Sequence, residues 1–170
     1  MRLTHPGFLA ALVAIVAAAA SLAACASSGG DSTSVASSGT IQVIRPDARL
    51  TPGDALPAGR VEICSSGYSK RVRDVSAQTK REIYAEYGIT SHQPGEYEVD
   101  HLIPLGIGGS NAKTNLWPQP FNVTAGAKEK DQLENDLHNR VCDGRIDVKQ
   151  AQREIALDWY AAYQKYVLNR

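Results

Sequence analysis

The sequence lacks a net charge, because 18 Lys and Arg residues are balanced by 18 Asp and Glu residues. Such a chain has no bulk attraction for polyanions, so any nucleic-acid binding has to come from a local basic patch. The sequence also lacks internal repeats and compositional bias, since 43% of its 170 residues are hydrophobic and 21% are charged. This composition excludes a fibrous or wholly disordered chain, and the length predicts one domain.

Long apolar runs are scarce, and the longest one covers residues 8–22. It follows Arg2, is rich in alanine, and is shorter than the roughly 20 residues that a membrane-spanning helix needs, so a secretory signal is predicted. The run leads into Leu-Ala-Ala-Cys, which ends at Cys25 and resembles the lipobox of bacterial lipoproteins, whose cysteine is lipidated. We therefore expect a signal peptide over residues 1–24 and a lipid on Cys25, with ordinary signal cleavage as the alternative.

Cysteine is also scarce, and none of the three cysteines belongs to a Cys-x-x-Cys pair, which argues against a zinc cluster. If Cys25 carries a lipid, Cys64 and Cys142 remain, and in an exported chain this pair predicts a disulfide, with a catalytic thiol as the alternative. Residues 25–40 are rich in serine and glycine and predict a flexible tether, so the folded domain is expected over residues 41–170. These features predict a protein of the bacterial cell envelope, lipid-anchored to a membrane and facing the periplasm or the exterior.

Residue periodicity predicts a mixture of helices and short strands. Extended or alternating segments are expected to be strands, and they cover residues 61–64, 97–103 and 115–117. Pro118 and Pro120 are expected to stop the last of these strands. Apolar residues at every third or fourth position predict helices, which cover residues 76–87, 125–142 and 147–167. The predicted fold class is therefore α+β.

The segment with the most chemical information is residues 98–117. It contains four pairs in a fixed order, Asp100-His101, Pro104-Leu105, Gly108-Gly109 and Asn115-Leu116. This pattern closely resembles the HNH nuclease family, also called the ββα-metal or His-Me finger fold. The flanks are similar to those of a group of small exported HNH proteins, in which a Lys-Asp-x-Leu-Glu helix ends in His and Cys. The resemblance implies a ββα-metal motif flanked by an N-terminal strand and helix and by C-terminal helices.

The resemblance implies a role for three residues of the motif. His101 is the general base, because a neutral imidazole with a pKa of about 6.5 can take a proton from water. Asp100 is a ligand of one divalent cation, Mg²⁺ or Mn²⁺, since these ions prefer oxygen ligands. Asn115 hydrogen-bonds the backbone across the loop and thereby orients His101.

A further metal ligand is expected near the start of the helix that follows the motif. Asn122 lies seven residues after Asn115, slightly early for that position of the family pattern. Asp131, Glu134 and His138 on the following helix are alternatives. Their other interpretation is a solvated charged face of that helix, on which Glu134 and His138 are neighbours.

A local basic patch lies upstream of the motif and consists of Lys70, Arg71, Arg73, Lys80 and Arg81. These side chains are expected to contact phosphates, with a solvated helix face as the alternative. No series of aromatic residues interleaves them, so recognition of particular bases is not expected.

These features predict an exported, lipid-anchored, metal-dependent endonuclease. It would hydrolyse phosphodiester bonds of DNA, with RNA as the alternative substrate, and with little sequence specificity. The competing hypothesis is a catalytically inactive surface lipoprotein that uses an HNH-like fold for binding. The intact set of Asp100, His101 and Asn115 favours the enzyme. No obligate protein partner is implied.

Overall fold

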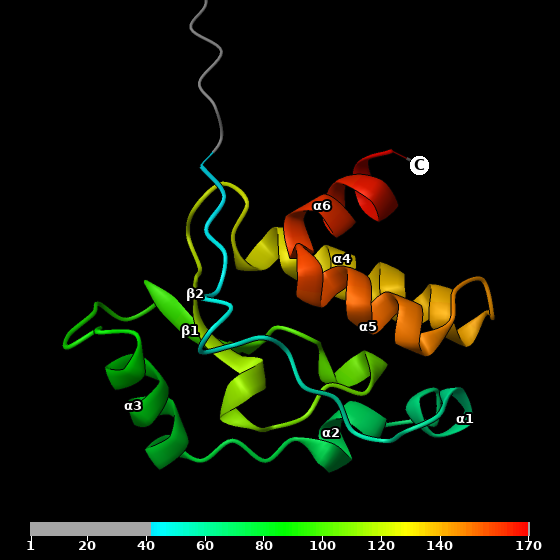
Figure 1. Cartoon of the computed structure of the whole chain (residues 1–170), viewed down its shortest axis with the longest axis horizontal. Coiled ribbons are helices and arrows are strands. Elements are labelled where there is room, and N and C mark those ends of the chain that lie inside the picture. Colours follow the sequence, from blue (N-terminus) through cyan, green and yellow to red (C-terminus); the bar gives the residue numbers. More distant parts are fainter. Residues whose placement is uncertain (1–41, 170) are drawn as a thin grey trace, which may run out of the picture. The chain divides into compact units, whose positions relative to one another are not determined.

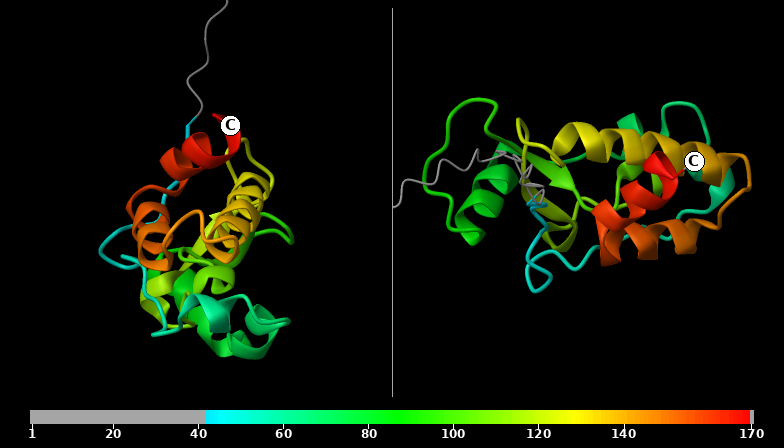
Figure 2. Two further views of the ribbon diagram at one scale, coloured as in Figure 1. Left: turned by 90° about the vertical axis from the view of Figure 1, so that its right-hand side faces the viewer. Right: turned by 90° about the horizontal axis from the view of Figure 1, so that it is seen from above.

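The structure is a computed structural model that describes residues 42–169. The predicted signal peptide, the tether and Cys25 lie outside the described residues. In Figure 1 the helix of residues 77–86 lies beside a two-stranded hairpin, and the C-terminal helices pack on one another. The two further views in Figure 2 show the same division. Among the described helices, none is long and apolar enough to cross a membrane.

The mixture of helices and strands agrees with the predicted α+β class. The helices are α1 (Arg60–Ile63), α2 (Tyr68–Val72), α3 (Ala77–Glu86), α4 (Ala127–Cys142), α5 (Val148–Leu157) and α6 (Trp159–Tyr163). The strands are β1 (Tyr97–His101) and β2 (Leu116–Pro120), and the short turns are η1 (Leu105–Ile107), η2 (Lys113–Asn115) and η3 (Gln164–Leu168). Because β1, β2 and α4 follow one another in this order, the hairpin leads into the longest described helix.

The predicted N-terminal strand at residues 61–64 is wrong, because this segment forms the single-turn helix α1. Strand alternation would place Val61 and Ile63 on the same face, but in the helical turn Val61 is 88% exposed and Ile63 is 1% exposed. Extended chain does contact the motif, but further upstream, where Ala55 forms a β-bridge with Gly109.

The strands β1 and β2 form an antiparallel hairpin in which Val99 lies opposite Pro118. The prediction that prolines stop the second strand is wrong, because Pro118 and Pro120 both lie within β2. The backbone bond from Leu102 to Asn115 marks a hydrogen-bonded pair, and such pairs alternate along antiparallel strands. Both prolines therefore occupy non-bonded positions, where the missing N–H leaves no bond of the hairpin unmade.

The predicted helix at residues 76–87 is confirmed as α3. The Ser76 hydroxyl caps it by accepting a hydrogen bond from the Thr79 backbone N–H. Gly88 follows its end with a φ of +71°, a conformation that glycine adopts without strain. The next predicted helix is confirmed as α4, which begins two residues later than expected, at Ala127.

The last predicted helix, residues 147–167, is divided into α5 and α6 at Asp158. Asp158 has an extended backbone, and its carboxylate accepts hydrogen bonds from the N–H groups of Tyr160 and Ala161, which begins a new helix. The same carboxylate forms an ion pair of 2.8 Å with Arg45. The apolar spacing continues across this break, so the sequence pattern does not reveal it.

The core lies between the C-terminal helices and the loop that follows β1. The apolar stripe predicted on α4 continues on α5 and α6, and its fully buried members are Leu133, Leu137, Val141, Ala151, Ile155 and Trp159. Leu102, Ile103 and Ile107 join the same cluster from the loop. Burial of apolar surface on both sides fixes the loop relative to the helices.

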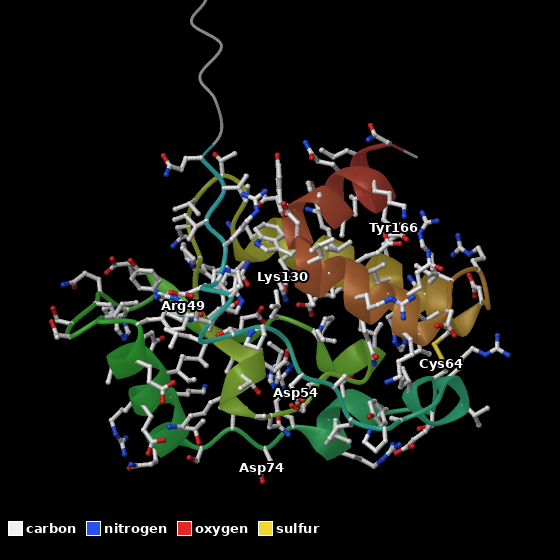
Figure 3. All side chains as sticks on the ribbon, viewed as in Figure 1. Arg49, Asp54, Cys64, Asp74, Lys130 and Tyr166 are labelled. Atoms are coloured by element: carbon white, nitrogen blue, oxygen red, sulfur yellow. A yellow bond between two sulfur atoms is a disulfide. The ribbon has the colours of Figure 1, made fainter. Side chains whose placement is uncertain are left out.

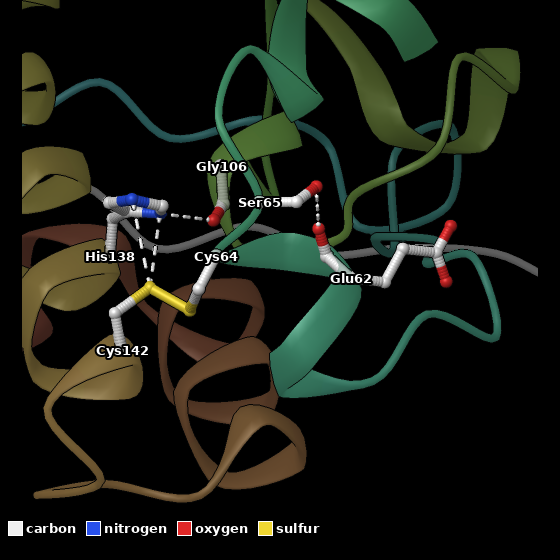
Figure 4. Close-up of a disulfide and its surroundings, with 6 residues drawn as sticks. All are labelled: Glu62, Cys64, Ser65, Gly106, His138 and Cys142. Carbon is white, nitrogen blue, oxygen red and sulfur yellow. Dashed lines mark hydrogen bonds between the residues drawn. A yellow bond between two sulfur atoms is a disulfide. The ribbon is translucent and has the colours of Figure 1, made fainter.

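The predicted disulfide between Cys64 and Cys142 is present. Cys64 follows α1 and Cys142 ends α4, so the bond joins the N-terminal helices to the helix that follows the hairpin (Figure 4). His138 lies beside it, with its Nε2 3.7 Å from the Cys142 sulfur. The His138 Nδ1–H donates to the Gly106 carbonyl oxygen over 2.6 Å, which connects the end of α4 to η1.

The double substitution Cys64→Ser and Cys142→Ser should lower the free energy of unfolding by about 4–5 kcal/mol, since the bond closes a long loop in the unfolded chain. Urea unfolding followed by circular dichroism measures this difference. Reductant should destabilise the wild type by a similar amount and leave the double variant unchanged. Equal stability of the wild type with and without reductant would contradict the prediction.

Candidate functional site

Asp100 and His101 are the last residues of β1, and Asn115 holds the loop behind them. The Asn115 side chain is fully buried. Its Oδ1 accepts a hydrogen bond from the Ile103 N–H over 2.9 Å, and its Nδ2 donates to the carbonyl oxygens of Ile103 and Ser110, each over 2.9 Å. These bonds close the loop onto the end of β1, and they are the cross-loop backbone contacts expected of Asn115.

The paired glycines of this loop are required by its backbone path. Gly108 has a φ of +85°, in the left-handed region that favours glycine. A Cβ atom at Gly109 would stand 1.7 Å from the Ile103 carbonyl oxygen. A side chain at that position would therefore force the loop away from the end of β1.

The carboxylate of Asp100 meets a buried lysine of α4. The Lys130 side chain is 1% exposed, and its Nζ lies 2.6 Å from the Asp100 carboxylate. The same Nζ donates to the His101 carbonyl oxygen over 2.7 Å and to the Glu134 carboxylate. Lys130 thus joins the end of β1 to α4 through two hydrogen bonds and an ion pair in the interior of the molecule (Figure 3).

The charges around Lys130 shift the pKa values of its neighbours. Burial lowers the pKa of Lys130, but the carboxylates of Asp100 and Glu134 outweigh this effect and raise it overall, so the lysine stays charged. Burial raises the pKa of Glu134, and the lysine opposes this. Burial and the charge of Asp100 also raise the pKa values of Glu98 and Asp131. Asp100 and Glu134 contact the ammonium directly, whereas Glu98 and Asp131 are affected by the charges of Asp100 and Lys130.

The imidazole of His101 is 3% exposed and contacts the loop rather than α4. Its Nε2 lies 3.0 Å from Oδ1 of Asn111. Burial lowers the pKa of His101, although the bond to Asn111 and the charge of Asp100 oppose this effect. His101 is therefore neutral near pH 7 and able to accept a proton.

The structure brings together part of the predicted metal-ligand set. Glu134 lies close to Asp100, since both carboxylates contact the same ammonium. Asn122 is exposed, and its Nδ2 donates to the Gly95 carbonyl oxygen over 3.1 Å, before the start of β1 rather than at its end. His138 lies beside the disulfide. Neither Asn122 nor His138 is brought to Asp100.

Among the five predicted phosphate-contacting residues, Arg73 has a charge that reaches the site, because it lowers the pKa of both His101 and Glu98. Within residues 42–169, the Arg73 guanidinium forms no hydrogen bond or ion pair. Arg71 and Arg81 instead bond to neighbouring side chains of the N-terminal helices. Arg73 is therefore the member of the basic patch whose charge acts on His101.

Sequence reasoning assigns no role to Lys130 or Asn111. Lys130 lies three residues before Leu133, on the same face of α4 as the apolar stripe. A charged residue at such a core position is the signal in the sequence that indicates a buried lysine. Asn111 has the sequence context of an ordinary turn residue, so nothing in the sequence indicates its contact with His101.

The donor chemistry at Asp100 and Glu134 fits a hard divalent cation. Mg²⁺ is usually held by one or two carboxylates and keeps water or phosphate oxygens as its other ligands. Among residues 42–169, no group of three or more His, Cys, Asp or Glu side chains is arranged to hold a metal ion. Among the described residues, the candidate ligands for the ion are therefore the carboxylates of Asp100 and Glu134. The ammonium of Lys130 already contacts both of them.

Comparisons with protein-family models, with curated proteins and with solved structures found no match to this chain. The functional interpretation therefore rests on the motif residues and their geometry. The central features are a neutral, buried histidine and a carboxylate at the end of β1, in a hairpin that leads into α4.

The Lys130→Met variant should lower the free energy of unfolding by about 3 kcal/mol, because it leaves the carboxylates of Asp100 and Glu134 without their buried partner. Thermal or urea unfolding measures this loss. The matched control is Lys128→Met, which removes an exposed lysine of the same helix and should change stability by less than about 0.5 kcal/mol. Equal effects of the two substitutions would show that the buried ion pairs do not stabilise the fold.

Proposed function

We propose that the protein is a metal-dependent endonuclease that hydrolyses phosphodiester bonds of DNA, with RNA as the alternative substrate, and with little sequence specificity. The observation that carries the proposal is the state of His101, which is buried, neutral and held at the end of β1 beside Asp100. A proton acceptor next to a carboxylate that can hold a cation provides two of the groups that phosphodiester hydrolysis needs.

In the proposed reaction, the neutral imidazole of His101 takes a proton from the attacking water. The water oxygen forms a bond to phosphorus while the bond from phosphorus to the leaving oxygen breaks, and the leaving oxygen takes a proton from solvent. We assign the guanidinium of Arg73 to a non-bridging phosphate oxygen, since its charge reaches His101 and it has no partner within residues 42–169.

Asp100 would hold the divalent cation, Mg²⁺ or Mn²⁺, and Glu134 is the second candidate ligand. Such a cation supplies positive charge that stabilises the phosphate and the leaving oxygen. Lys130 keeps both carboxylates in place through contacts to each of them. Glu134 takes precedence over Asn122 here because Asn122 bonds to Gly95 instead.

One observation favours the alternative of a catalytically inactive lipoprotein that uses this fold for binding. The ammonium of Lys130 already contacts Asp100 and Glu134, so a cation would have to share these carboxylates with it. Under this alternative the lysine balances the two charges by itself, and added metal ions would produce no cleavage.

We further propose that the protein is exported and anchored through a lipid on Cys25 to a bacterial membrane, facing the periplasm or the exterior. The disulfide between Cys64 and Cys142 supports an oxidising compartment, because thiols stay reduced in the cytosol. The anchor rests on the lipobox-like sequence that ends at Cys25. A nuclease in this location would act on nucleic acid outside the cytoplasm.

The His101→Ala variant should cleave plasmid DNA about 10²–10⁴ times more slowly than the wild type in Mg²⁺ or Mn²⁺, because it lacks the base. Gel analysis of nicked and linear plasmid measures the rates, and EDTA should abolish wild-type cleavage. The matched control is His92→Ala, which removes an exposed histidine. Undiminished cleavage by His101→Ala would exclude this mechanism, and a wild type without metal-dependent cleavage would favour the binding alternative.

The Arg73→Gln variant should lower kcat/KM for DNA about 10- to 100-fold, which is the effect of losing one hydrogen bond between charged groups. The control is Arg153→Gln, which removes the same charge from an exposed position of α5. If both substitutions lower kcat/KM equally, the effect comes from overall charge and the assignment of Arg73 to the phosphate is wrong.

A further inference from the structure

The side chain of Asn111, in the loop between η1 and η2, contacts two separate parts of the chain. Its Oδ1 lies 3.0 Å from Nε2 of His101 and accepts a hydrogen bond from the Asp74 backbone N–H over 3.2 Å. Its Nδ2 donates to the Val72 carbonyl oxygen over 2.7 Å. Asn111 therefore joins His101 to the two residues that flank Arg73.

The two backbone groups fix the orientation of the Asn111 amide. A carbonyl oxygen only accepts hydrogen bonds, so the Val72 carbonyl has to face the NH₂ group. A backbone N–H only donates, so the Asp74 N–H has to face the amide oxygen. A flipped amide would break both bonds and place like groups against each other. The amide oxygen is therefore the atom that faces His101.

Because an amide oxygen cannot donate, Nε2 of His101 has to carry the hydrogen of their bond. A neutral imidazole has one N–H, so its lone pair then lies on Nδ1, which has no hydrogen-bond partner among the described residues. We infer that Asn111 is a positioning residue that selects the Nε2–H tautomer of His101 and leaves Nδ1 as the ring nitrogen available to the attacking water. This inference rests on the proposed nuclease function for its catalytic meaning.

The same amide positions the segment that carries Arg73. Its bonds to Val72 and Asp74 hold the backbone on both sides of the arginine. The Asn111 side chain thus positions both His101 and the segment of Arg73, the residue assigned to the phosphate. Its loss should therefore lower kcat for DNA cleavage through His101 and raise KM for DNA through Arg73.

Imidazole ¹⁵N NMR of the full-length protein in EDTA, at a pH well above the His101 pKa, tests the tautomer without requiring catalysis. The wild type should show a slowly exchanging Nε2–H proton on His101 and an unprotonated Nδ1. His138 is an internal reference for the opposite tautomer, because its Nδ1–H donates to the Gly106 carbonyl oxygen. Spectra of His101→Gln and His138→Gln assign the signals.

Three variants separate this role from a general contribution to folding. Asn111→Ala removes the acceptor, so the Nε2–H proton should exchange rapidly and the tautomers should mix, while kcat for plasmid cleavage falls about 10- to 100-fold. Asn111→Asp restores an acceptor oxygen and should restore the Nε2–H signal and part of kcat. Asn139→Ala removes an exposed asparagine of α4 and should leave the His101 signals unchanged.

An Nδ1–H proton on His101 in the wild type, or an unchanged Nε2–H signal in Asn111→Ala, would overturn the inference. The wild-type spectrum decides the tautomer even if Asn111→Ala fails to fold, which circular dichroism reveals. A wild type with the expected tautomer but without metal-dependent cleavage would refute the nuclease proposal and leave the tautomer assignment standing.

Discussion

A buried ammonium, that of Lys130, holds the end of β1 against α4, with hydrogen bonds to the His101 carbonyl and to Glu134 and an ion pair with Asp100. Removing a charge of this kind from water costs several kcal/mol, which only a full set of partners offsets. The contacts to Asp100 and to the His101 carbonyl are therefore satisfied together or not at all. This requirement fixes how α4 lies against the hairpin, and with it the position of the two residues that the proposed chemistry uses.

The loop after β1 is held from two sides by asparagine side chains. Asn115 lies inside the loop and bonds to its backbone, whereas Asn111 reaches outward to His101 and to the segment around Arg73. Gly109 allows the close approach on which the inner contacts depend. The histidine is thereby held by neighbours that are themselves fixed, and its burial lowers its pKa.

The helix α4 is attached at both of its ends. Near its beginning Lys130 bonds to the hairpin, and at its last residue Cys142 is joined to Cys64 beside α1. The apolar stripe between these points packs on the C-terminal helices. Polar, covalent and apolar contacts therefore act on one element.

The sequence by itself determined the α+β class and the helices α3 and α4, because periodicity and capping residues are local properties. The disulfide was expected from the oxidising compartment, and the closing of the loop by Asn115 from the resemblance of the motif. Tertiary structure decided the rest. The turn α1 replaced a predicted strand, and the break at Asp158 follows from a cap and an ion pair with distant Arg45. The contact of Asn111 with His101, and the burial of a lysine among carboxylates, arise only when separate segments meet, since neither residue's neighbours in sequence are its partners in space.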